Sequence, residues 1–127
     1  MLVAICDDSR IDLLLSKTLV IEYFRKHKLS CTVRLYENGT SLLDDLRDNT
    51  NFDIVFMDPP YGKELEKEVL TYLATSKLID EDSLIIVEMS DRTAFDYVHE
   101  LGFTVEKLKK YKTNMHLFLK RAGQKED

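Results

Sequence analysis

Three aspartates stand directly after two short apolar runs, at the point where each run would end a buried strand. Asp7 and Asp8 follow residues 2–6, and Asp58 follows residues 52–57. In a parallel sheet such strand ends meet at one edge, which is where ligands bind. Two carboxylates ~4 Å apart repel by about 4 kcal/mol at an effective dielectric of about 20. The edge therefore binds a hard cation, holds a proton or lowers stability, and Mg²⁺ is the cation that such oxygen ligands suit.

The most specific motif of the chain is Asp58-Pro59-Pro60-Tyr61. Two consecutive prolines remove two backbone donors, and each biases the preceding residue toward extended conformations. Such a turn presents the carboxylate of Asp58 and the ring of Tyr61 at the edge of the sheet. A carboxylate accepts hydrogen bonds from an exocyclic amine, and an aromatic ring stacks on a planar base. The motif therefore predicts a base-binding turn.

Apolar runs alternate with helical patterns, which predicts β–α–β crossovers and a mostly parallel sheet. Four parallel strands are expected at residues 2–6, 31–36, 52–57 and 83–89. Two further strands, at residues 103–110 and 114–120, are too close together for a crossover helix, so they must pair antiparallel. The predicted fold is a three-layer, doubly wound α/β sheet of flavodoxin-like or Rossmann-like type, with strand order 2-1-3-4-6-5 and strand 6 antiparallel.

Helices are expected between these strands, two on each face of the sheet or close to it. Their predicted ranges are residues 9–27, a short segment capped by Thr40 or Ser41, residues 63–76 and residues 92–101. The first helix is capped by Asp8 or Ser9, and five apolar side chains are expected to face the sheet: Ile11, Leu14, Leu15, Leu19 and Phe24. Gly102 suits the C-terminal cap of the last helix.

The composition is that of one ordinary globular domain, expected at residues 1–121 with a polar tail at 122–127. The chain has 127 residues, 44% of them hydrophobic, and a net charge of −5, which argues against holding nucleic acid by bulk electrostatics. No apolar run reaches the ~20 residues that span a bilayer, and no signal peptide is recognised. Cys6 and Cys31 are expected to be free thiols in the cytoplasm.

The front of the chain resembles the receiver domain of two-component response regulators of the LytTR type. The resemblance covers residues 1–58 and rests on residues 3–8, the helix at 11–24, and residues 33–39, 42–46 and 52–58. By that resemblance Asp7 and Asp8 would bind the metal and Asp58 would accept the phosphoryl group. Receivers also need a hydroxyl residue and a lysine after the next two strands. Ser90 matches the hydroxyl loosely, and no residue matches the lysine.

The back of the chain resembles the C-terminal part of the S-adenosylmethionine-dependent amino-methyltransferases that act on guanine N2 of small-subunit ribosomal RNA. The resemblance covers residues 52–121 and rests on residues 52–61, 78–79, 83–88, 102–103 and 109–111. It implies that Asp58 and Pro59 bind the target amine and that Tyr61 stacks on the base. The glycine-rich cofactor turn of that family is absent after the first strand. Glu37, after the second strand, matches only the acid that binds a ribose.

The two resemblances together predict a hybrid joined near residue 51, a recombined or engineered scaffold without a complete active site. No cofactor is expected except weakly bound Mg²⁺ at Asp7, Asp8 and Asp58, and S-adenosylmethionine is not expected. No partner is evident: neither nucleic acid nor a membrane is expected, and the chain would be a monomer or a weak homodimer. The alternatives are an amino-methyltransferase and a receiver-like phosphoacceptor. A lysine cluster contacts either a phosphate backbone or only solvent at a strand edge: Lys107, Lys109, Lys110 and Lys112.

Overall fold

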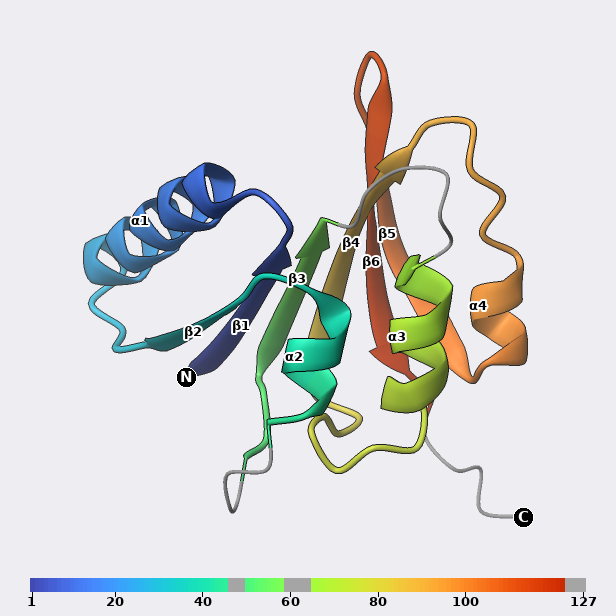
Figure 1. Ribbon diagram of the computed structural model, residues 1–127, viewed down its shortest axis with the longest axis horizontal. Coiled ribbons are helices and arrows are strands. Elements are labelled where there is room, and N and C mark those ends of the chain that lie inside the picture. The colour runs from blue at the N-terminus through green and yellow to red at the C-terminus, as the bar shows by residue number, and fades with distance from the viewer. Residues whose placement is uncertain (46–49, 59–64, 123–127) are drawn as a thin grey trace.

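Six strands form one sheet in the computed structural model, which describes residues 1–45, 50–58 and 65–122. The sheet has the order β2-β1-β3-β4-β6-β5 (Figure 1). β1, β2, β3 and β4 pair in parallel, and β6 is antiparallel to both β4 and β5. The predicted fold class and strand order are therefore confirmed. The bounds are β1 (Leu2–Asp7), β2 (Thr32–Tyr36), β3 (Ile54–Asp58), β4 (Leu84–Ser90), β5 (Phe103–Lys110) and β6 (Asn114–Arg121).

The helices are distributed unevenly over the two faces of this sheet. α2 (Gly39–Leu43), α3 (Leu65–Leu73) and α4 (Tyr97–Glu100) contribute to one apolar cluster, whereas α1 (Arg10–Lys26) contributes to another. Figure 1 shows α1 beside β2 and β1, apart from the other three helices. The expectation of two helices on each face is thus wrong. We call the side covered by α2, α3 and α4 the three-helix face, and the opposite side the α1 face.

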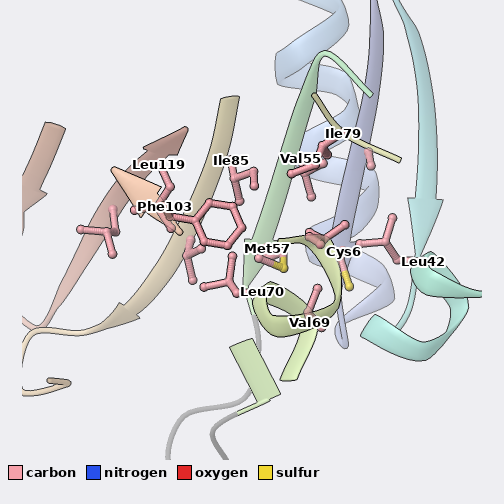
Figure 2. Packing of buried hydrophobic residues seen from close by; sticks show 14 of the residues in the cluster. Cys6, Leu42, Val55, Met57, Val69, Leu70, Ile79, Ile85, Phe103 and Leu119 are labelled. Carbon is pink, nitrogen blue, oxygen red and sulfur yellow. The ribbon is translucent and has the colours of Figure 1, made fainter. Parts of the chain in front are cut away.

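The three-helix face holds the larger core. Alternate residues of the strands point into it, as the pleat of a β-strand requires. Figure 2 shows Cys6 of β1 and Met57 of β3 beside Val69 and Leu70 of α3, all of them buried. Ahead of β3 and β4, the buried Ser83 hydroxyl donates a hydrogen bond to the Phe52 carbonyl at 2.6 Å. This bond ties together the beginnings of the two strands, at the edge of the sheet opposite to Asp58.

The predicted inner stripe of α1 is mostly wrong. Ile11, Leu14, Leu15 and Leu19 are 52–72% exposed, and the residues of the helix that are buried are Leu13 and Phe24. Apolar residues occur all round this helix, so the sequence pattern offers more than one face. Leu13, Val20 and Phe24 lie on one face of the helix because their positions follow helical spacing. This face packs on β1 and β2.

Several helix boundaries also differ from the prediction. Ser9 caps α1 as expected, since its hydroxyl accepts a hydrogen bond from the Asp12 amide at 3.3 Å. The cap of α2 is Asn38, which accepts from the Ser41 amide at 2.8 Å, and not Thr40 or Ser41. α4 has only four residues, and Gly102 follows it with φ +97°, a conformation that glycine adopts without strain. Among the described residues, no helix is long and apolar enough to cross a membrane.

Two substitutions in α1 distinguish the observed inner face from the predicted one. Leu13→Ala removes a buried side chain and should lower the free energy of unfolding by about 2–5 kcal/mol. Leu15→Ala makes the same chemical change at an exposed position and should alter it by no more than about 0.5 kcal/mol. Urea denaturation followed by circular dichroism measures both. Equal losses in the two variants would contradict the orientation of α1.

Candidate functional site

Two of the three predicted aspartates meet at the carboxyl edge of the sheet. The parallel register of β1 and β3 pairs Asp7 directly with Asp58, and their side chains hydrogen-bond to each other. Asp7 is 4% exposed, and its Oδ1 also accepts from the Ser9 amide at 2.9 Å. The same loop that begins α1 thus fixes the carboxylate of Asp7 beside Asp58.

The two carboxyl groups share a proton near neutral pH. Burial, together with the nearby charges of Glu88 and Asp7, raises the pKa of Asp58 to about 7. Burial also raises the pKa of Asp7, whereas the hydrogen bonds from Ser9 and Asp58 favour its ionised form. The proton therefore resides on Asp58, which donates to Asp7. Of the three outcomes left open by the sequence, proton retention is the one that this geometry favours.

A small cavity of about 90 Å³ opens beside this pair, between the ends of β1, β2 and β3 and the beginning of α3. Cys6, Met57 and Val69 form its apolar part. Five carboxyl groups also line it: Asp7, Asp8, Glu37, Asp58 and Glu66. The lining described here contains no lysine, arginine or histidine, so the cavity favours ligands that donate hydrogen bonds or carry positive charge.

Glu66 is a lining residue that the sequence analysis missed. It lies in the first turn of α3 and is 8% exposed. Only the packing of α3 against α2 brings it to the cavity: a Cβ atom at Gly39 would overlap the Val69 side chain, so the two helices approach closely. A glutamate in the first turn of a helix is favoured by the helix dipole in any protein. Its sequence position therefore carries no signal for a site.

The remaining predicted residues are less well placed, or lie outside the described part of the chain. Asp8 is exposed at the rim of the cavity, and Glu37 is exposed at its mouth. Pro59 and Tyr61 lie outside the described residues. In the described ranges, no group of three or more His, Cys, Asp or Glu side chains is placed to hold a metal ion. Mg²⁺ binding at Asp7, Asp8 and Asp58 thus stays a prediction without structural support.

Cys6 does not act as a nucleophile in this cavity. Burial, reinforced by the charges of Asp7 and Asp8, raises the pKa of the Cys6 thiol to about 12. The thiolate is the reactive form of cysteine, and at neutral pH it is essentially absent here. Both Cys6 and Cys31 are free, as the sequence predicts.

On the α1 face, a second polar group borders Asp58. Glu88 of β4 accepts a hydrogen bond from the Asn114 side-chain amide, and its Oε2 lies 3.7 Å from His116 Nε2. The His116 ring also packs against Phe56, with ring centroids 5.9 Å apart. No spacing in the sequence links His116 to Glu88, because β6 reaches β4 only through the antiparallel register. Asp58 therefore lies between an acidic cavity and a polar group that contains an imidazole.

The arrangement suits hydrogen-bond acceptance and proton transfer. An ionised carboxylate accepts from amines and hydroxyls, and a carboxyl group with a pKa near 7 exchanges its proton efficiently at neutral pH. Perturbed carboxyl groups in a cavity at the carboxyl ends of parallel strands are typical of functional sites.

A family model described as "Conserved hypothetical protein 95" matches residues 16–120. The chain is also 35% identical over 48 residues to the uncharacterized methylase RP545 of Rickettsia prowazekii. That match covers 38% of this chain and only 20% of the relative.

Solved structures of similar fold include three bacterial proteins. The putative methylase HI0767 of Haemophilus influenzae has a TM-score of 0.60 and 16% identity, over 94% of this chain and 72% of that one. A conserved hypothetical protein of Streptococcus pyogenes has a TM-score of 0.65 and 20% identity, over 97% and 73%. The putative methyltransferase yhhF of Escherichia coli has a TM-score of 0.60 and 17% identity, over 97% and 76%. At these identities the likeness shows the fold alone.

The family match corrects the interpretation of the chain as a hybrid. One model runs without a break across residue 51, where the join between two ancestries was expected, so neither a join nor an engineered origin is supported. The comparisons support the methyltransferase-like resemblance and give no support to the receiver resemblance of residues 1–58. The chain belongs to the conserved hypothetical protein 95 family.

Proposed function

We propose that this chain is part of an S-adenosylmethionine-dependent amino-methyltransferase, in which Asp58 accepts hydrogen bonds from the amine of a planar base. The observation that carries the proposal is the position of Asp58. It ends β3 beside an acidic cavity, it is paired with Asp7, and it is followed in sequence by Pro59-Pro60-Tyr61. Guanine N2 of ribosomal RNA is the substrate that the sequence resemblance favours.

Relatives named as methylases support this proposal. They also favour S-adenosylmethionine as the cofactor, against the expectation drawn from the missing glycine-rich turn. The sequence-based preference for an inert scaffold depended on a join between two families, which the family match does not support. The phosphoacceptor alternative has no lysine in the sequence at the strand end where a receiver needs one, and the described residues contain no group of three or more side chains placed to hold a metal ion.

The described cavity fits only part of S-adenosylmethionine. Glu37 at the mouth can accept from ribose hydroxyls, and the neighbouring carboxylates can accept from an amino group. The cofactor's own carboxylate finds no cationic partner among the described lining residues. The volume of about 90 Å³ is also well below the roughly 300–1,000 Å³ of ordinary ligand pockets. The whole cofactor therefore does not fit the part of the site that residues 1–45, 50–58 and 65–122 form, and we assign no catalytic step to it.

The role proposed for Asp58 requires that its proton can leave. A neutral carboxyl group accepts hydrogen bonds more weakly than a carboxylate, and Asp58 is protonated below a pH of about 7. Binding of an amine donor at Asp58 competes with this proton, so amine binding should strengthen as the pH rises through 7. Glu88 lies on the other side of Asp58, and its negative charge helps to keep the proton on Asp58 up to a pH of about 7.

The shared proton can be detected as a pH dependence of stability. The pKa of Asp58 is raised in the folded state, so its contribution to stability is full below the unfolded value of about 4 and is lost as the pH rises through 7. Asp58→Asn removes this dependence. The difference in unfolding free energy between Asp58→Asn and the unaltered protein should favour the variant more at pH 8 than at pH 5. The change between the two pH values should be about 1–2 kcal/mol, after allowance for partial exposure.

Urea denaturation at the two pH values measures this difference. The matched control is Asp96→Asn, because Asp96 is exposed and its side chain makes no capping hydrogen bond. Its effect should be the same at both pH values. A difference in Asp58→Asn that is absent, or that has the opposite sign, would show that Asp58 is not protonated in the folded protein.

The part of the cofactor that fits can be tested with adenosine. Isothermal titration calorimetry should show saturable adenosine binding that Glu37→Gln weakens about tenfold, because a charge-assisted hydrogen bond to the ribose is replaced by a neutral one. Glu22→Gln on α1 is the control and should bind like the unaltered protein. If adenosine does not bind, or if Glu37→Gln has no effect, the cavity is not a nucleoside site.

A further inference from the structure

The hairpin formed by β5 and β6 carries cations and aromatic rings in alternation on the α1 face. We call this the hairpin surface; it consists of Lys107, Lys109, Tyr111, His116 and Phe118. Lys107 pairs with Phe118 across the hairpin, and Lys109 pairs with His116. Lys107 and Lys109 are exposed, and Tyr111 is 44% exposed.

Contacts between neighbouring side chains join these residues into one row. The ammonium group of Lys107 lies 5.8 Å from the centre of the Phe118 ring, and that of Lys109 lies 5.4 Å from the centre of the Tyr111 ring. The rings of Tyr111 and His116 are 5.0 Å apart at 64°. Two ammonium groups thus lie beside aromatic rings, at distances within the range of cation–π contact.

The hairpin surface continues to the candidate site. His116 contacts Phe56 of β3 and faces Glu88, which lies next to Asp58 in the sheet. On the α1 face, α1 packs on β1 and β2 and also borders Ile54 and Phe56 of β3, where it lines a cavity of about 380 Å³ that reaches Ile86 of β4. The β5 and β6 part of this face lies beyond α1 (Figure 1), and Phe118 there is half-buried. A chain-like ligand can therefore run from the hairpin to the carboxyl edge without meeting a helix.

Strand-edge protection alone does not explain this surface. Lysines on an edge strand discourage aggregation through their charge, and that role requires no aromatic neighbours. Here β5 is the edge strand, but two of its lysines are held beside rings on the face that leads to Asp58. Alternating cations and stacking rings are what a single-stranded nucleic acid requires, because the cations contact phosphates and the rings stack on bases.

We propose that the hairpin surface binds a single-stranded nucleic acid and directs one amine-bearing base toward Asp58. The second half of this statement rests on the proposed function, whereas the first half does not. The net charge of −5 led to the expectation that nucleic acid is not a partner, but that charge is an average over the chain. Five carboxyl groups line the cavity, whereas Lys107 and Lys109 lie together on the hairpin surface.

Fluorescence anisotropy with a labelled RNA strand of about ten nucleotides tests the surface directly, since such proteins contact roughly 4–16 nucleotides. The double variant Lys107→Gln/Lys109→Gln should bind about tenfold more weakly. The slope of log affinity against log salt concentration should become less steep by about 1.4, because two phosphate contacts to a single strand are lost. Tyr111→Leu should also weaken binding about tenfold through lost stacking. The control Lys17→Gln/Lys26→Gln removes two lysines from α1 and should bind like the unaltered protein.

Three results would overturn the proposal. One is equal weakening in the hairpin and α1 double variants, which would indicate only diffuse electrostatics. The second is equal affinity for the duplex of the same sequence together with no effect of Tyr111→Leu, which would exclude stacking. The third is tighter binding to phosphatidylserine vesicles than to RNA. Thermal melts of each variant must match the unaltered protein, so that unfolding does not mimic lost binding.

The link to Asp58 is tested separately from the surface. Strands that contain one guanine should bind more tightly than strands with inosine, which lacks the exocyclic amine, and Asp58→Asn should abolish this preference. A preference that persists in Asp58→Asn would remove the link while leaving the hairpin surface in place. Adenosine calorimetry reports on the nucleoside cavity independently, so failure of the proposed function and failure of the hairpin surface give different results.

Discussion

The parallel pairing of β1 with β3 is the constraint on which the rest of the site depends. It brings two aspartates to the same register position at the ends of their strands. Burial denies them the solvent that would let both ionise, so one proton is retained. The loop before α1 orders Asp7 through the Ser9 amide, and Asp58 takes the proton. The function proposed for Asp58 thus depends on a carboxyl group whose ionisation is regulated by its neighbour.

The antiparallel β6 determines what surrounds this pair on the other side. Because β6 lies between β4 and β5, it brings Asn114 and His116 to Glu88. A parallel strand at that place would present its carboxyl end to the same acidic edge. The antiparallel direction instead brings the Asn114 amide to Glu88, to which it donates a hydrogen bond, and it pairs β6 with the lysine-rich β5 that precedes it. The topology therefore places a cavity lined by five carboxyl groups and a hairpin rich in lysine at different parts of the same sheet.

The sequence predicted the strand order and the meeting of Asp7 and Asp58, because both follow from short connections and from where apolar runs end. It did not predict which side of α1 is buried, since apolar residues surround that helix and only contact with β1 and β2 selects Leu13. Glu66 and His116 were missed because tertiary packing alone brings them to the site. The hybrid interpretation was wrong because the run from residue 52 to Asp58 fits two families equally well, and a match over residues 16–120 was needed to choose.

Charge separation has a consequence for how a polyanion could approach this edge. Phosphates are repelled by the carboxylates of the cavity over a Debye length of roughly 8 Å at physiological salt, and they are attracted by Lys107 and Lys109. A base is neutral and carries its donors at its rim, so the same carboxylates attract its amine. A strand held by its backbone on the hairpin would therefore present bases, rather than phosphates, to Asp58. The acidic edge would thus repel the phosphate backbone of the strand and attract the amine of a base, which is the group that the proposed function acts on.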